Sequence, residues 1–271
     1  MKRAILLAAY GAATLQSEAA LRNFAAAARE RFPGVPVRWA FTSCQVRERM
    51  TAARKKTDSV QKALQKLWFE KFTHVAVQPL QTIAGRENRD IAAAVQDMTR
   101  DTTLTLRVGA PLLETPEDVA AAARAVAAHV PEERLPDEDV VLMGHGAKHA
   151  AVARYDDLAA AVRALDARVH VGAMNGAARL EDILPRLTSH RVWLMPLLSV
   201  VGRHALEDMA GHGPASWRSR MEAAGHECRP VLRGMAEYAG FIALWLDHLA
   251  GAMRALEDGG PSLQCEEKDN A

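Results

Sequence analysis

One segment of this chain occurs twice. Val75–Glu87 aligns without a gap on Val192–His204, and both copies keep a valine, a Pro-Leu pair and a Gly-Arg pair at matching positions. Glu87 at the end of the first copy falls on His204 at the end of the second. Chance does not explain so many ordered matches, so we expect a duplicated unit with pseudo-two-fold symmetry. Any fold assigned to one half must then fit the other.

Each half alternates short apolar runs with stretches of helical periodicity. Continuous runs rich in Val, Ile, Leu and Ala are typical of strands buried in a parallel sheet. Strands that alternate with helices predict two similar doubly wound α/β domains, each a parallel sheet flanked by helices and related to the other by internal duplication. The expected strands are Ala4–Tyr10, Val37–Phe41, His74–Leu80, Leu104–Val108, Val140–Met143, Val169–Ala173, Val192–Pro196 and Glu227–Val231.

Proline-rich and polar segments indicate the domain boundaries. Pro131–Asp137 is the best linker, so we expect an N-terminal domain over 1–130, a C-terminal domain over 138–258, and a polar, disordered tail over 259–271. An apolar helix over Met235–Leu256 has two candidate uses: packing back on the first domain, or forming the interface of a homo-oligomer. The other expected helices are Ser17–Phe32, Val46–Lys56, Val60–Phe69, Gly85 to about Met98, Thr115 to about His129, Val152–Leu165 and Leu180–Leu187, with a helical region over His204–Ala224 that is interrupted at Gly211–Pro214.

The composition of the 271-residue chain excludes several classes of function. A net charge of +1 gives no basic excess for nucleic acid, and no apolar run is long enough to span a membrane. Met1–Ala13 has the basic start and small-residue end of a signal peptide, but its match to the second half makes it a strand, so we expect no cleavage. Cys44, Cys228 and Cys265 lack metal or redox spacing, and we expect a cytoplasmic protein.

The run Asp139–Gly146 carries the first candidate site residue. It ends in Gly-His-Gly, which places His145 at the carboxyl end of a buried strand, where open α/β sheets bind ligands. Gly144 and Gly146 remove two side chains beside the imidazole, so a bulky group can approach it closely.

A shorter repeat brings the first half into the same argument. Ile5–Ala12 aligns on Val140–Ala147, which sets Tyr10 and Gly11 on the histidine and second glycine of the Gly-His-Gly run. The two candidate strand ends are therefore equivalent positions of the duplicated unit.

Three side chains are expected to converge where equivalent strand ends face each other across a cleft. Such clefts between domains are favoured places for small-molecule sites. Glu87 comes from the first domain, and His145 and His204 come from the second. Two imidazoles and a carboxylate, with other positions open, are a competent set of ligands for a divalent transition metal.

Ordered motifs through most of the chain, from Ala4 to Leu249, point to a family. They are Ala40–Ser43, Ala76–Gln78, Gly85–Glu87, Gly109–Leu113, Met143–Ala147, His149, Val171–Ala173, Leu194–Leu197, Gly202–Ala205, Asp208–Ala210 and Ser216-Trp217. Together they resemble the class II tetrapyrrole chelatases, most closely the branch that inserts cobalt into sirohydrochlorin in anaerobic cobalamin synthesis. The resemblance implies a chelatase-like bilobal fold and an ATP-independent reaction with Co²⁺ as substrate and no nucleotide cofactor.

The resemblance also implies roles for individual residues. His145 and His204 match metal-binding and catalytic histidines of the family, and Glu87 matches an active-site glutamate. The family usually has a metal-binding glutamate where this chain has Asn175. An amide oxygen is a weaker ligand than a carboxylate, so Asn175 is both a candidate ligand and a candidate turn residue before Gly176.

The substrate of that family is a flat, polyanionic macrocycle, and its site needs an apolar cleft with cations at the rim. Basic side chains near the strand ends are therefore candidates for pairing its carboxylates, although each also suits a solvated surface. The residues expected to contact substrate are Tyr10, Gly11, Arg86, Gly144, Gly146 and Arg203, with Lys148 and Arg47 as further candidate cations.

Three alternatives stay open. The same site could insert Fe²⁺ to make sirohaem, and Ni²⁺ is a further metal to test in vitro. A tetrapyrrole or metal carrier without catalysis is a second alternative. A phosphotransferase that uses His145 as nucleophile ranks lowest, because it would want an arginine where this chain has Gly144.

Overall fold

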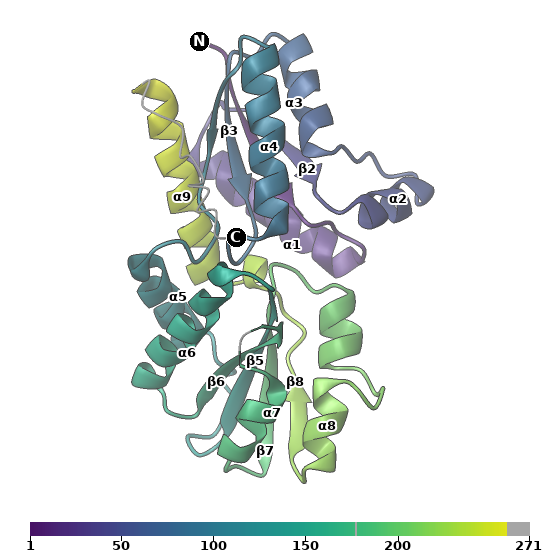
Figure 1. The fold of residues 1–271 in the computed structure, drawn as a ribbon, viewed down its shortest axis with the longest axis vertical. Helices are drawn as coiled ribbons and strands as arrows, with labels where there is room; N and C mark the ends of the chain where they lie inside the picture. The colour runs from purple at the N-terminus through teal and green to yellow at the C-terminus, as the bar shows by residue number, and fades with distance from the viewer. Residues whose placement is uncertain (177, 259–271) are drawn as a thin grey trace. The chain divides into compact units, whose positions relative to one another are not determined.

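The computed structural model describes residues 1–176 and 178–258, and within them each half of the chain forms a four-stranded parallel sheet (Figure 1). The strand orders are β2-β1-β3-β4 and β6-β5-β7-β8, the same order in both halves. This confirms two similar, doubly wound α/β sheets. The strands are β1 (Arg3–Ala9), β2 (Val37–Phe41), β3 (His74–Pro79), β4 (Thr105–Val108), β5 (Asp139–Gly146), β6 (Val169–Asn175), β7 (Arg191–Leu197) and β8 (Glu227–Pro230).

Helices connect the strands in both halves. Side-chain caps at Ser59 and Thr115 begin two of them, and Thr115 forms a capping box with Asp118. The α-helices are α1 (Leu15–Arg31), α2 (Cys44–Ala52), α3 (Val60–Phe69), α4 (Arg86–Asp101), α5 (Pro116–Ala128), α6 (Ala153–Leu165), α7 (Leu180–Ile183), α8 (Trp217–Ala223) and α9 (Ala239–Glu257). The shorter turns are η1 (Ala150–Val152), η2 (Leu184–Arg186), η3 (His204–Met209) and η4 (Met235–Glu237), of which η3 is a π-helix.

The register between the central strands is the same in both sheets. Ala8 of β1 lies opposite Pro79 of β3, and Met143 of β5 lies opposite Pro196 of β7. These are the pairs of residues that the two sequence repeats align. The duplication therefore extends from the residues to the hydrogen-bond ladders.

Two compact units differ from the domains expected from sequence. One unit contains residues 1–13, 25–111 and the chain from Trp245, and the other contains 14–24 and 112–244. Helix α5, expected in the first domain, belongs to the second unit because it lies beside α6 (Figure 1). The boundary also falls inside α1 and α9, so the linker expected at Pro131–Asp137 lies within one unit. The expected tail 259–271 lies outside the described residues.

Each sheet is covered by apolar helix faces. In the first unit, Leu6 of β1 lies in one buried cluster with Leu64 of α3 and Ile91 of α4. In the second, Met143 of β5 shares a cluster with Trp217 of α8. No helix among residues 1–176 and 178–258 is long and apolar enough to cross a membrane.

A buried carboxylate at the start of β5 forms hydrogen bonds with residues near the starts of the two neighbouring strands, β6 and β7. Asp139, which is 1% exposed, accepts hydrogen bonds from the backbone N–H groups of Thr188 (2.8 Å) and Ser189 (2.9 Å) and from His170 Nε2 (3.1 Å). Burial alone would raise the pKa of the Asp139 carboxyl. The hydrogen bonds from Ser189, Thr188 and His170 outweigh that effect and hold the pKa below its ordinary value.

We predict that Asp139→Asn lowers the free energy of unfolding by about 2 kcal/mol at neutral pH, because an amide cannot accept all these hydrogen bonds. A lowered folded-state pKa stabilises the fold above the unfolded-state value of about 3.9 and ceases to do so as pH falls through the folded-state value. The gap between wild type and variant in urea unfolding should therefore shrink below about pH 4. The exposed Asp137→Asn is the control, and a gap that stays constant with pH would contradict this account.

Candidate active site

Two histidines lie at the carboxyl edge of the second sheet. The structure extends β5 beyond the expected end at Met143 to Gly146, so His145 is the exposed penultimate residue of the strand. His204 begins the π-helix η3, which follows β7. Ala205 and Met209 of η3 are fully buried and anchor the π-helix to the core. π-Helical segments are rare in proteins as a whole, but those that occur are often found at functional sites. Here the π-helix leaves the His204 side chain partly exposed.

The two imidazoles lie next to each other. Their ring centroids are 5.1 Å apart and the ring planes make an angle of 67°. A metal-bound imidazole nitrogen lies about 2.1 Å from its ion, so two rings sharing an ion at a roughly tetrahedral angle would have centres about 5 Å apart. The separation of His145 and His204 therefore fits one shared divalent ion.

Hydrogen bonds set the tautomer of both rings. His145 Nδ1 lies 3.0 Å from the carbonyl oxygen of Gly146, and His204 Nδ1 lies 2.6 Å from Oδ2 of Asp208. A carbonyl or carboxylate oxygen accepts, so each Nδ1 carries the hydrogen and each neutral ring keeps a lone pair on Nε2. A partner on the second ring nitrogen is the usual arrangement of metal-binding histidines.

Asp208 is a candidate site residue to which reasoning from the sequence assigned no role, although it begins the motif Asp208–Ala210. It follows His204 by four residues, a spacing that brings side chains together on one helical face. That His-x-x-x-Asp spacing was the available signal. Asp208 orients His204 and is committed to that role by its hydrogen bond.

Close packing also explains why the two residues beside His145 are glycines. A Cβ on Gly144 would lie 2.3 Å from the ring of Tyr155, so this glycine admits a buried aromatic side chain. Gly146 has φ +72°, and a Cβ there would lie 1.8 Å from the carbonyl oxygen of Asn175. Glycine is required at Gly146 by both the left-handed backbone and the neighbouring strand.

Asn175, the candidate third ligand of this half, is the last residue of β6. Its side-chain Nδ2 donates to the backbone carbonyl of His145 at 3.2 Å. Among residues 1–176 and 178–258, no group of three or more His, Cys, Asp or Glu side chains is placed to hold a metal ion. The described geometry thus offers a pair of imidazoles with the remaining coordination positions open.

The predicted site residues of the first unit follow the carboxyl ends of its strands. Tyr10 comes directly after β1 and is half exposed, and Gly11 follows it. Glu87 is partly buried in the first turn of α4, where a negative charge complements the helix N-terminus. Their placement in the first unit matches that of His145 and His204 in the second.

Most of the candidate cations already form ion pairs or hydrogen bonds with neighbouring residues. Arg86 and Arg203 each face an acidic residue one turn on, with Nε–carboxylate distances of 4.0 Å to Asp90 and 2.7 Å to Glu207. Arg47 donates to the backbone carbonyls of Phe41 and Thr42, so it holds the end of β2 in place. Lys148 is exposed.

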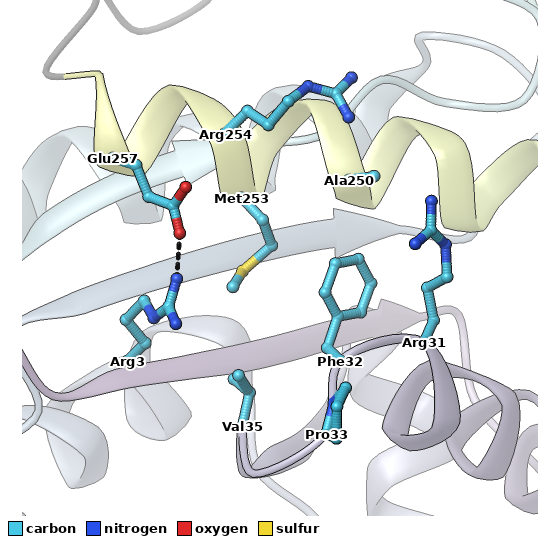
Figure 2. A pocket seen from close by; sticks show the side chains of 9 residues that line it. All are labelled: Arg3, Arg31, Phe32, Pro33, Val35, Ala250, Met253, Arg254 and Glu257. Carbon is cyan, nitrogen blue, oxygen red and sulfur yellow. Dashed lines mark hydrogen bonds and ion pairs between the residues drawn. The ribbon is translucent and has the colours of Figure 1, made fainter.

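A cavity of about 270 Å³ opens elsewhere on the first unit, at the amino edge of its sheet (Figure 2). Arg3 and Glu257 form an ion pair on its wall, and Phe32 and Met253 line its apolar side (Figure 2). Parallel sheets bind ligands at the opposite, carboxyl edge. We therefore keep the candidate active site at the strand ends that carry the histidines.

The fold is shared with solved chelatases. The sirohydrochlorin chelatase SirB from Bacillus subtilis subspecies spizizenii, in complex with cobalt, superposes with a TM-score of 0.64 and 15% identity, over 95% of this chain and 98% of that one. At this level of identity the likeness concerns the fold alone, two α/β units of the kind described above.

The sequence identifies the family within that fold. The model of the cobalt chelatase family (CbiK) matches residues 3–254. The sirohydrochlorin cobaltochelatase CbiKC of Nitratidesulfovibrio vulgaris strain Hildenborough is 58% identical over 261 residues, 95% of this chain and 93% of the relative. The sirohydrochlorin cobaltochelatase of Salmonella typhimurium is 33% identical over 260 residues, 93% of this chain and 97% of the relative. The chain belongs to the cobalt chelatase (CbiK) family.

We predict that Gly146→Ala destabilises the protein by more than its backbone conformation alone requires. Gly34 has φ +77° with open space around its Cα, so Gly34→Ala isolates the cost of a left-handed alanine, about 1 kcal/mol. Gly146→Ala adds a collision with Asn175 and should cost at least about 2 kcal/mol more in urea unfolding. It should also weaken Co²⁺ binding. Equal losses in the two variants would contradict the packing described for Gly146.

Proposed function

We propose that this protein inserts Co²⁺ into sirohydrochlorin without hydrolysing a nucleotide, in the cobalt-early, anaerobic branch of cobalamin synthesis. One observation carries the proposal beyond family membership. Two imidazoles stand 5.1 Å apart at the carboxyl edge of a parallel sheet, each held through Nδ1 so that Nε2 is available to a metal ion.

The metal is a substrate, and the site must release it. Two neutral imidazoles bind a divalent cobalt ion without filling its coordination sphere, and open positions are what a reacting metal requires. The four macrocycle nitrogens can then replace the protein ligands one after another. A closed site with four protein ligands would hold the ion too well for this transfer.

The reaction also releases two protons. Sirohydrochlorin loses two pyrrole N–H protons as cobalt binds its four nitrogens, so the site needs acceptors. Imidazole accepts protons in the physiological pH range, and His145 Nε2 gains a free lone pair when the ion leaves it. We assign His145 as ligand and principal base and His204 as second ligand, oriented by Asp208.

Glu87 has a further proposed role, as a metal ligand or proton acceptor from the first unit. Support comes from the internal repeat, which sets Glu87 on His204, and from its position at the start of α4 after the carboxyl end of β3. A carboxylate there would supply the negative charge that the two imidazoles lack. Asn175, a neutral amide, supplies none.

Substrate contacts are proposed for the residues around these strand ends. Tyr10 presents a half-exposed aromatic face suited to a flat macrocycle. Arg86 and Arg203 are exposed enough to exchange their helix partners for substrate carboxylates, because exposed ion pairs are weak. Gly11, Gly144 and Gly146 complete the proposed set.

Cobalt preference is part of the proposal, and iron is its alternative. Nitrogen ligands favour Ni²⁺ and Cu²⁺ over Co²⁺ on affinity alone, so preference must come from geometry or metal supply. The second alternative is a carrier that binds metal or tetrapyrrole without turnover. We propose a cytoplasmic location, and the use of α9 in a homo-oligomer stays a prediction.

We predict that His145→Ala and His204→Ala each lower cobalt insertion at least about 100-fold while leaving the fold intact, because one imidazole cannot hold and release the ion alone. The measurement is spectrophotometric insertion with sirohydrochlorin and Co²⁺, Fe²⁺ or Ni²⁺. His190 is exposed at the amino edge of the same sheet, and His190→Ala is the matched control. Near-normal insertion by His145→Ala would refute the assignment, faster turnover with Fe²⁺ would favour the sirohaem alternative, and binding without turnover would favour the carrier.

We predict a different pattern for Glu87→Gln. The amide keeps the shape of the side chain and removes its charge, so kcat for cobalt insertion should fall at least about tenfold. Binding of Co²⁺ by the histidine pair should change less than in His145→Ala. Glu117→Gln, at the same first-turn position of α5, is the control. Wild-type kcat in Glu87→Gln would remove Glu87 from the proposed site.

A further inference from the structure

Asn175 makes two contacts with the run that carries His145. Its side-chain Nδ2 donates to the carbonyl oxygen of His145 at 3.2 Å, and its own carbonyl accepts from the N–H of Ala147 at 3.1 Å. We infer that Asn175 is a positioning residue that sets the orientation of the His145 imidazole through the main chain. The inference rests on the proposed role of His145 in binding cobalt.

The two contacts hold the two peptide groups on either side of Gly146. The side chain of Asn175 holds the peptide that joins His145 to Gly146, and its carbonyl holds the peptide that joins Gly146 to Ala147. The carbonyl of this second peptide is the Gly146 oxygen that accepts from His145 Nδ1. Asn175 therefore fixes both ends of the hydrogen bond that orients the ring.

The main chains around this contact are closely packed. Gly146 lies opposite Asn175 in the register between β5 and β6. A Cβ on Gly146 would lie 1.8 Å from the carbonyl oxygen of Asn175, and a Cβ on Gly176 would lie 2.0 Å from that of Ala147. Close packing of two main chains is what allows one side-chain amide to position the loop.

The chemistry of the contact selects an amide. A carbonyl oxygen only accepts, so the group that faces the His145 carbonyl must donate. A carboxylate at this position would have no hydrogen to donate and would place two acceptors against each other. The nitrogen end of the Asn175 side chain is thus committed to the main chain, and the residue adds no negative charge beside the imidazoles.

The first unit shows the same contact made in another way. The registers of β1 with β2 and of β5 with β6 make Ser43 the equivalent of Asn175 and Tyr10 the equivalent of His145. The backbone N–H of Ser43 donates to the Tyr10 carbonyl at 3.1 Å, while its hydroxyl caps α2. In the second unit β6 ends at Asn175, and the side chain of Asn175 supplies the donor to the equivalent carbonyl.

The test compares Asn175→Asp with Asn175→Ala. Asn175→Asp keeps the shape, removes the donor and adds a ligand charge, so it separates positioning from ligation. Metal-free protein is titrated with Co²⁺ and followed by the visible d–d absorption of the bound ion, and kcat and KM for Co²⁺ are then measured in the insertion reaction.

We expect both variants to bind Co²⁺ about tenfold more weakly than wild type, as is typical when a group that orients a ligand is lost. Their d–d spectra should also change in shape, and a loss of stability alone would not change the shape of the spectrum. Thr188→Ala removes the hydroxyl that accepts from Arg168 at the opposite edge of the sheet, and should leave both affinity and spectrum unchanged. Thermal unfolding of all variants checks that they fold.

Tighter Co²⁺ binding by Asn175→Asp than by wild type would overturn the inference and make position 175 a ligand. Wild-type binding by both variants would overturn it too. Because the titration needs no sirohydrochlorin, its outcome is independent of turnover. A wild-type protein that binds Co²⁺ but inserts none would refute the proposed function and leave the role of Asn175 intact, whereas no Co²⁺ binding at all would refute both.

Discussion

The register between the central strands of each sheet decides where the candidate site residues of this protein lie. Ala8 faces Pro79 in one sheet and Met143 faces Pro196 in the other, so equivalent residues leave equivalent strand ends. A shift by one residue would turn every side chain of a strand to the other face of its sheet. Both faces of β1 and β5 are buried, so such a shift would exchange side chains of different size between two filled cores. The same packing that stabilises each unit therefore places its candidate site residues.

Duplication supplied two copies of this arrangement, and the copies have since diverged at the strand ends. The second unit carries His145 and His204, each with an acceptor on Nδ1, whereas the first carries Tyr10 and Glu87 at the matching positions. These hydrogen bonds require little ordering of other groups, because one acceptor is the main-chain carbonyl of Gly146 and the other is a carboxylate on the same short helix as His204. In the proposed site these hydrogen bonds would fix the tautomer and the orientation of both imidazoles before a metal ion arrives, which would lower the entropy lost on binding.

Much of the fold could be predicted from sequence because its signals are local. Val60–Phe69 has the predicted bounds because Ser59 caps a strongly periodic segment. The run Asp139–Gly146 is a strand throughout, whereas the expected range Val140–Met143 stopped three residues early, because glycine is depleted in strands and pairing with β6 extends β5 through Gly-His-Gly. The expected helix Met235–Leu256 was wrong at its start: it is broken into η4 and α9. Likewise, the π-helix that brings Asp208 to His204 depends on burial of Ala205 and Met209, a tertiary effect.

In the proposed site, the two imidazoles of the second unit bind one cobalt ion through Nε2. X-ray absorption at the cobalt K edge, on protein loaded with one equivalent of Co²⁺, tests it most directly. The account predicts the multiple-scattering signature of two imidazole rings at about 2.1 Å, reduced to one ring when either histidine is replaced. A wild-type spectrum with no imidazole, or one that His204→Ala leaves unchanged, would contradict it.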